Sequence, residues 1–430
     1  LFSRQHRHRT PSLVQRGIVA QRNLLDGEGA PSKPGWESGR LDRLTDWAAS
    51  RKANRDVICQ YKPSSSSLWF RWKGTVLKLT IRSVLLSMLA GLAVDCTVRS
   101  FAVQRWPRFA VPPATDPIIG GLEGLRRLWG YQFTLGTFIL TFFTSQAYSY
   151  WQMVYNTTRA IQGRINDICM LITMAAQRVT NTQNKPNKYS RKAENLVRLC
   201  TRLVRVSHTF FWAATPTASN GLSDCEEFIS DTEKCPLPID DEHIGPLLLS
   251  PYGLSALAKT GQLTQAEVDG LLRSGLPPHE YHLVLLQWAG MHAMNGIKQG
   301  ILSCGDGFEE NLLRQMTTLR GEYFNIDDFR AGRMPLAYVQ LVQVLVDSLV
   351  FLAPCALYPE LGFLSIPLAG LMTLFFKGLM ELSKSFLDPF GVEGFPGQNI
   401  RVDVLVSELN FGAGTRWIQA GAKLPLIPED

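Results

Sequence analysis

The chain has 430 residues, 45% of them hydrophobic, and a mean hydropathy near zero. This balance excludes a fully embedded transporter and leaves room for one membrane domain and a sizeable soluble part. The formal net charge of +7 suits anionic lipid, an anionic solute or nucleic acid as a partner. The aromatic residues concentrate in the apolar stretches and are not interleaved with basic ones, so nucleic acid is not expected.

The eight cysteines show no CxxC pair and none of the dense spacing of a disulfide scaffold. Cys225 and Cys235 flank a polar loop, and their spacing is compatible with a disulfide or with two free thiols. His279 and His282 form a close histidine pair, but two ligands make a weak metal signal, and a surface or capping role is expected. We therefore expect no metal site and no cofactor.

Residues 1–66 are predicted to be a basic amino-terminal tail with one short helix at 39–54. Residues 1–23 contain five arginines and no acidic residue, a composition typical of organellar import sequences. The initial Leu1 in place of Met suggests that a longer presequence has been removed, and a truncated chain with a basic tail is the alternative. The aromatic and cationic run at 68–74 suits a membrane interface.

The first membrane half is predicted at 67–155, and its first span covers 75–98. Lys78 and Arg82 near the start of this span can extend to lipid headgroups, so they need no functional role. The many Lys and Arg residues ahead of the span place the amino terminus inside. The following connection, 99–129, is also basic, which suggests either a vestibule that concentrates anions or a partly buried loop without a special role.

Residues 130–150 form the second predicted span, around which the chain is organised. They contain no Lys, Arg, Asp or Glu, and as a helix they extend roughly 31 Å, about one hydrocarbon thickness. Hydroxyl and amide side chains such as Gln132, Thr134 and Thr144 are nevertheless scattered through the span. Because lipid cannot satisfy such groups, we expect a pore or a tightly packed bundle here.

The helical period continues beyond this span into a predicted soluble helical domain at 156–335. Further helices are predicted at 191–212, 282–303 and 309–323. No strand pattern competes with them. Thr264 and Glu267 fit a capping box that opens a short helix ending at Arg273. This helix lies in 214–280, which is otherwise predicted to be an inserted polar loop.

Residues 336–384 are predicted to be the second membrane half, a helical hairpin that reverses at the Tyr-Pro-Glu of 358–360. The total is then four spans, so residues 385–430 form a carboxyl-terminal segment on the side of the soluble domain. Asp347 lies inside the third span. It is either a functional group or an acid paired with a neighbouring helix.

Four passages, taken in order, resemble motifs of the bestrophin family of anion channels. RWKGTVLKL at 71–79 resembles the opening of the first helix, and 142–168 is similar to the second-helix pattern of bacterial and plastid members. MPLAYVQ at 334–340 resembles the start of the third helix, and DPFG at 388–391 the motif after the fourth. The resemblance covers about residues 68–412. It implies an all-α membrane protein with four transmembrane helices and a helical soluble domain, pentameric around one axial pore.

The resemblance also implies a hydrophobic neck, lined at every fourth residue of the second helix by Thr134, Phe138 and Phe142. A four-residue step is close to one helical turn, so these side chains lie along one stripe. Two aromatic rings per subunit would form a constriction that dewets when closed. From the residues alone, ordinary interhelical packing by phenylalanine would be the preferred interpretation.

The resemblance also implies a narrower aperture on the inner side at Met334, just before the proline of the third-helix motif. A soft methionine there would make a wider or more adaptable ring than a branched residue, and Arg330 and Arg333 would add positive charge nearby. The sequence departs from the second-helix pattern at Phe143 and Tyr150, where arginines are usual, and this puts conduction in doubt.

Calcium gating is not expected, because animal members bind Ca²⁺ through acidic residues that follow the motif after the fourth helix, and here DPFG continues as VEGFP.

The first hypothesis is a channel for chloride, and also bicarbonate or nitrate, in an organellar membrane, with the plastid thylakoid favoured over the mitochondrial inner membrane. Its partners would be further copies of the chain, small anions and membrane lipid. The second is a non-conducting subunit of the same fold that serves as an assembly or docking component of a larger membrane complex. An enzyme is not expected, since no nucleophile with a base, metal cluster or phosphate loop is present.

Overall fold

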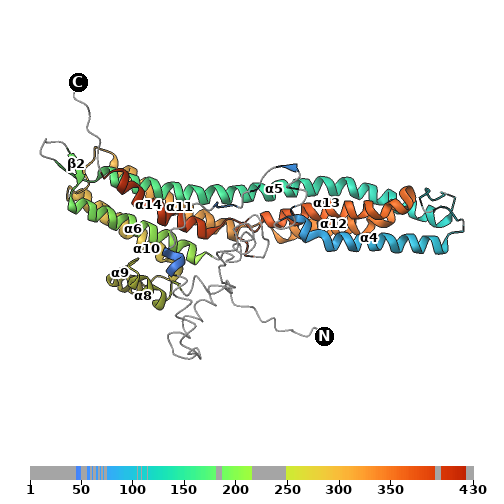
Figure 1. Cartoon of the computed structure of the whole chain (residues 1–430), viewed down its shortest axis with the longest axis horizontal. Helices are drawn as coiled ribbons and strands as arrows, with labels where there is room; N and C mark the ends of the chain where they lie inside the picture. The colour runs from blue at the N-terminus through green and yellow to red at the C-terminus, as the bar shows by residue number, and fades with distance from the viewer. Residues whose placement is uncertain are drawn as a thin grey trace, which may run out of the picture.

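The computed structural model describes residues 45–49, 56–58, 61, 64–65, 68, 71, 75–103, 105–107, 109–113, 115–180, 186–215, 248–392 and 399–422. This part of the chain is elongated and almost wholly helical (Figure 1). Most of the predicted amino-terminal tail lies outside the described residues, although 45–49 are helical as expected. Cys225 and Cys235 also lie outside them, so their pairing stays a prediction.

A single helix, α5 (Pro117–Ala175), runs the length of the molecule (Figure 1). The Asp116 carboxylate accepts a hydrogen bond from the Ile118 N–H, and Pro117 supplies a first turn that needs no amide donor. With 59 residues the helix is about 88 Å long. The predicted central span therefore continues into the soluble half without a break.

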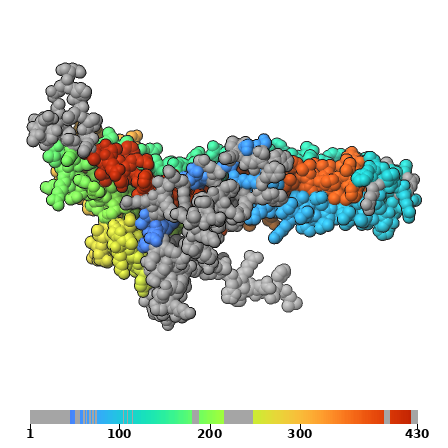
Figure 2. Space-filling view, in the orientation of Figure 1, coloured from blue at the N-terminus to red at the C-terminus, as the bar shows by residue number. Residues whose placement is uncertain are grey.

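The predicted membrane half contains α4 (Val76–Phe101), α12 (Leu336–Leu361) and α13 (Ser365–Phe386) beside the first part of α5. Helices α12 and α13 pack against α5, and α4 packs on α13 and α12. Figure 2 shows α4 beside the α12–α13 hairpin on one face. The α4–α13 contact is close, because a Cβ on Gly370 would lie 2.7 Å from the Met88 Cγ and the Ser87 hydroxyl donates to the Ala369 carbonyl. Small residues let membrane helices approach in this way.

Two stretches of the described chain are long and apolar enough to cross a membrane, Val76–Phe101 and Leu336–Phe386. The second contains both α12 and α13. The central part of α5 does not reach the same hydropathy, since hydroxyl and amide side chains dilute its apolar residues. Its crossing of the membrane stays a prediction.

The turn between the two helices of the hairpin lies further along the chain than the predicted 358–360. Helix α12 continues through Tyr358, Pro359 and Glu360, and the turn is made by the short 3-10 helix η5 (Gly362–Leu364). Gly362 has a φ of +51°, and a Cβ there would lie 3.1 Å from the Ala110 carbonyl oxygen. The positive φ and the close approach explain why glycine, and not the preceding proline, sets the turn.

The predicted soluble half contains four long helices beside the second part of α5 (Figure 1). They are α6 (Arg191–Ala214), α10 (Tyr281–Lys298), α11 (Phe308–Ala331) and α14 (Val402–Ala420). Three of them contact α5, and the fourth, α10, packs on α6 and α11. Their buried faces share one core with the apolar stripe of α5 that includes Ile161, Ile165, Ile168 and Ile172. Spacings of three and four residues place that stripe on one side of the helix.

The region predicted to be an inserted polar loop contains two helices, α8 (Pro251–Lys259) and α9 (Gln265–Arg273), and the 3-10 helix η4 (Pro278–Glu280). The capping box of Thr264 and Glu267 is present as predicted. Glu267 also binds Arg202 of α6 through both carboxylate oxygens, at 2.9 and 2.7 Å. This ion pair holds the small helical unit against the soluble half.

Two short strands were not expected from the sequence. β1 (Arg178–Thr180) and β2 (Pro186–Tyr189) pair antiparallel after the end of α5. Strands of three and four residues are too short to show a period of two.

Candidate functional site

The three residues predicted to line the neck lie on an exposed side of α5 in the single chain. The side chains of Phe138 and Phe142 are 71% and 53% exposed, and Thr134 is exposed as well. In an assembled membrane protein, phenylalanines exposed on such a helix would face lipid, a neighbouring subunit or an enclosed pore. Their role in a pore stays a prediction.

The opposite side of the same part of α5 is packed against the hairpin. Leu140 and Phe143 are enclosed in the membrane-half core, and the ring of Phe143 meets that of Tyr338 edge to face at 5.7 Å. The Trp129 indole N–H donates to the Leu349 carbonyl at 2.9 Å. The hairpin thus fixes the rotation of α5 about its axis, which directs Phe138 and Phe142 outward.

The polar side chains of the central stretch are mostly satisfied within α5. Thr137 and Thr141 each donate to a carbonyl one turn earlier at 2.8 Å, a bond that removes the need for an outside acceptor. Other groups join helices: Gln132 donates to Ser348, and the Thr144 and Ser383 hydroxyls lie 2.8 Å apart. The density of hydroxyls is therefore weaker evidence for a pore than the sequence suggested.

The predicted aperture lies at the junction of α11 and α12. Met334 is partly buried against the membrane-half core, and Arg333 is half-buried. The Arg330 Nη1 lies 3.8 Å from the Asp327 Oδ1. The Tyr150 hydroxyl donates to the Phe329 carbonyl at 2.8 Å, so the region is attached directly to α5.

Asp347 is paired with a neighbouring helix, which favours the structural interpretation over a functional site. Its Oδ1 lies 2.8 Å from the Lys377 Nζ of α13, and its Oδ2 accepts a hydrogen bond from Gln343 at 2.9 Å.

The basic connection between the first two spans is partly neutralised. The Arg99 Nε lies 2.8 Å from the buried Asp95 carboxylate, and Arg126 pairs with Glu123 at 2.9 Å and with Glu360. These pairs reduce the positive charge available to a vestibule.

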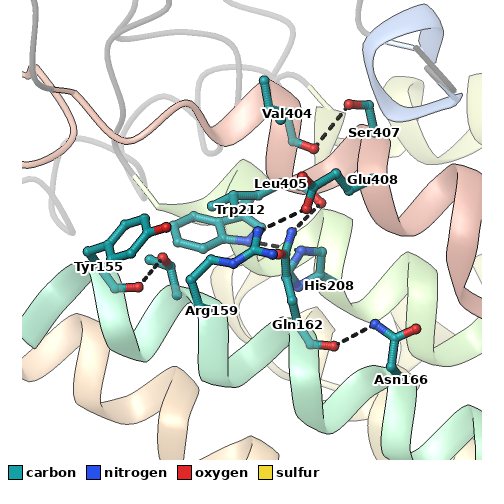
Figure 3. Close-up of polar contacts among 11 residues, drawn as sticks. Tyr155, Arg159, Gln162, Asn166, His208, Trp212, Val404, Leu405, Ser407 and Glu408 are labelled. Atoms are coloured by element: carbon teal, nitrogen blue, oxygen red, sulfur yellow. Dashed lines mark hydrogen bonds and ion pairs between the residues drawn. The ribbon is translucent and has the colours of Figure 1, made fainter. Parts of the chain in front are cut away.

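A buried polar network in the soluble half was missed from the sequence (Figure 3). The Trp212 indole N–H donates to His208 Nε2 at 3.1 Å, so this nitrogen carries no proton. His208 Nδ1 faces the Tyr323 hydroxyl at 3.4 Å and the Leu405 backbone. Burial lowers the pKa of His208 to about 3, so the ring is neutral. His208 and Trp212 are one turn apart on α6, but no sequence signal places Tyr323 beside them.

The same network attaches α14 to α5. Arg159 pairs with Glu408 at 2.9 Å, and the Gln162 amide donates to the Leu405 carbonyl at 3.1 Å (Figure 3). His208 and these contacts therefore join three helices around Leu405.

The histidine pair does not form a metal centre. His282 is buried, and its Nδ1 contacts the His279 carbonyl at 2.9 Å. Among the described residues no group of three metal-ligating side chains comes together. Neither histidine makes a side-chain cap at the start of η4 or α10.

No protein-family model matches the sequence, and no curated protein does. Solved structures do match. A tryptophan-to-alanine variant of a bacterial bestrophin homologue from Klebsiella pneumoniae superposes with a TM-score of 0.51 over 82% of this chain and 99% of its own, at 15% identity. A further structure of a bestrophin homologue from this organism matches with a TM-score of 0.50 over 80% of this chain and 99% of its own, at 13% identity.

The chain has the bestrophin fold. The mostly helical, bestrophin-like fold predicted from the four motifs is confirmed, since the match extends over nearly the whole length of the solved chains. The four transmembrane helices and the pentamer stay predictions. A likeness at this identity establishes the bestrophin fold and not the activity.

Proposed function

We propose that the protein is an anion channel whose pore is lined by the exposed side of α5 in a ring of several copies, five by analogy with the fold. Its substrates are chloride and other small monovalent anions such as bicarbonate or nitrate. Thr134, Phe138 and Phe142 form the neck, and Met334 the inner aperture.

One observation carries the proposal. On a helix that the hairpin holds in a fixed rotation, two phenylalanines one turn apart are largely exposed, in a chain with the bestrophin fold. Exposed rings at this spacing would meet around an axis when copies assemble. The positive edges of aromatic rings also interact with a partly dehydrated anion more favourably than an aliphatic wall would.

The test is anion flux through purified protein in liposomes. Replacing Phe138 or Phe142 with Ala widens a hydrophobic constriction and removes its barrier to water, so chloride flux should rise several-fold. Phe351→Ala is the matched control, because this ring on α12 is 80% exposed but lies outside the predicted neck; its flux should equal that of the wild type. Equal effects of all three substitutions would contradict the assignment of the neck.

Absence of flux from folded wild type and from both neck variants would favour the second hypothesis, a non-conducting subunit that docks in a larger membrane complex. The same preparation distinguishes the two hypotheses, since a channel conducts without other proteins.

For location we propose an organellar membrane, with the thylakoid ahead of the mitochondrial inner membrane. The arginine-rich, acid-free composition of residues 1–23 supports this. A fluorescent fusion to the full chain that accumulates in the plasma membrane would contradict it.

A further inference from the structure

Arg330 and Arg333, the two arginines beside Met334, differ in how well nearby negative or polar groups compensate their positive charges. The Arg330 side chain is 23% exposed, and the nearest acid that pairs with it, Asp327, is 3.8 Å away with 55% of its own side chain exposed. The Arg330 Nε is fully enclosed and has no hydrogen-bond acceptor among the described residues. Such a guanidinium has lost water without gaining a close partner.

Arg333 is in a different position. Its side chain hydrogen-bonds the Tyr150 hydroxyl, and the negative charge of Asp388 also acts on this hydroxyl. Asp388 is 1% exposed, and its Oδ1 accepts from the Val392 N–H at 2.9 Å. Arg333 therefore has a close hydrogen-bond partner, the Tyr150 hydroxyl, on which a buried negative charge also acts.

The electrostatic surroundings of Arg330 support this difference between Arg330 and Arg333. Burial lowers its pKa, and the opposing effects of Asp327 and Tyr150 do not cancel that of burial; the charge of Arg333 lowers it further. A mobile anion would supply the missing negative charge. Guanidinium groups suit this task because they are weakly hydrated and present several N–H donors in one plane.

We propose that Arg330 is an anion-binding residue at the inner end of the conduction path and takes a small monovalent anion such as chloride, whereas Arg333 is a positioning residue that attaches the aperture to α5. The inference rests on the proposed function and deepens it. The inner site then selects for anions through one under-compensated charge per subunit, and the hydrophobic neck controls passage.

The permeability of chloride relative to potassium tests the proposal, measured from reversal potentials of the purified protein in planar bilayers. Arg330→Gln should lower this ratio several-fold, Arg330→Lys should retain most of it, and Asp327→Asn should leave it equal or higher. Arg320→Gln is the matched control, because this exposed arginine lies on the same helix away from the junction; it should behave as wild type. A ratio unchanged in Arg330→Gln, or lowered equally in Arg320→Gln, overturns the proposal.

A second measurement does not depend on conduction. Chloride in place of gluconate at constant ionic strength should raise the Tm of wild type and of Arg320→Gln, and this shift should disappear in Arg330→Gln. If wild type does not conduct but the Arg330-dependent shift is present, the anion site stands and the channel function fails. If wild type conducts and the shift survives in Arg330→Gln, the channel function stands and the anion site fails.

Discussion

His208 shows how a single side chain links acidity to the stability of the soluble half. Burial holds the pKa of His208 near 3 and that of His282 near 4, against an ordinary value of 6.5. An unfolded chain binds protons at these histidines below pH 6.5, while the folded chain does not. The free energy of unfolding should therefore fall as the pH drops from 6.5 towards 4, by up to about 1.4 kcal/mol per pH unit for each histidine.

Thermal unfolding of the purified protein between pH 8 and pH 4 measures this effect. His208→Gln should reduce the dependence of Tm on pH over this range, and substitution of the exposed His292 should not. A pH dependence identical in wild type and His208→Gln would show that the acid sensitivity arises elsewhere.

At the scale of elements, the Asp347–Lys377 pair joins the two helices of the hairpin. Lys377→Met would leave an unpaired acid inside a predicted span, whereas the double change Asp347→Leu with Lys377→Met removes both charges. Because an unpaired charge costs more than the absence of the pair, the single variant should be less stable than the double variant; the 47% exposure of the Asp347 side chain keeps the difference at about 1 kcal/mol. Thermal unfolding in detergent compares the two; equal stability would mean that Asp347 is well solvated.

The elements that depend on local signals could be predicted from the sequence. The capping box at Thr264, the helix that starts at Arg191 and the continuity of α5 follow from neighbouring residues alone. The turn at Gly362 could not, since its positive φ accompanies a close approach to Ala110, far away in the sequence. The partners of His208 were missed for the same reason, because they come from three different helices.

At the scale of the whole molecule, one α5 cannot enclose a pore, so the proposed function requires several copies. Native mass spectrometry of the protein in detergent should show five copies of the 48.1 kDa chain. Copies carrying Phe138→Cys, in a background without the exposed Cys96 and Cys304, should form disulfide-linked dimers within the oligomer. A folded monomer, or the absence of cross-links at this position, would contradict a neck around a shared axis.

The bestrophin-like fold was predictable from the order and spacing of four short motifs, and the structural matches confirm that fold. The number of membrane spans and the oligomeric state stay predictions. The site was predictable only in part. The neck at Phe138 and Phe142 stays a prediction, and the sequence treats Arg330 and Arg333 alike. Their difference arises from Tyr150, Asp327 and Asp388, which the fold brings together.

The unbroken helix α5 makes the two halves of the molecule one mechanical part. The backbone hydrogen bonds of α5 resist twisting of the helix. A rotation about the helix axis at Gln162, where α14 is attached, should therefore be transmitted almost fully to Phe142, about 30 Å away. A rotation imposed at the α5–α14 contacts would therefore also turn the Phe142 ring. Under the proposed function, the half of the molecule that contains α14 would therefore set the angle at which the Phe142 side chain faces the pore.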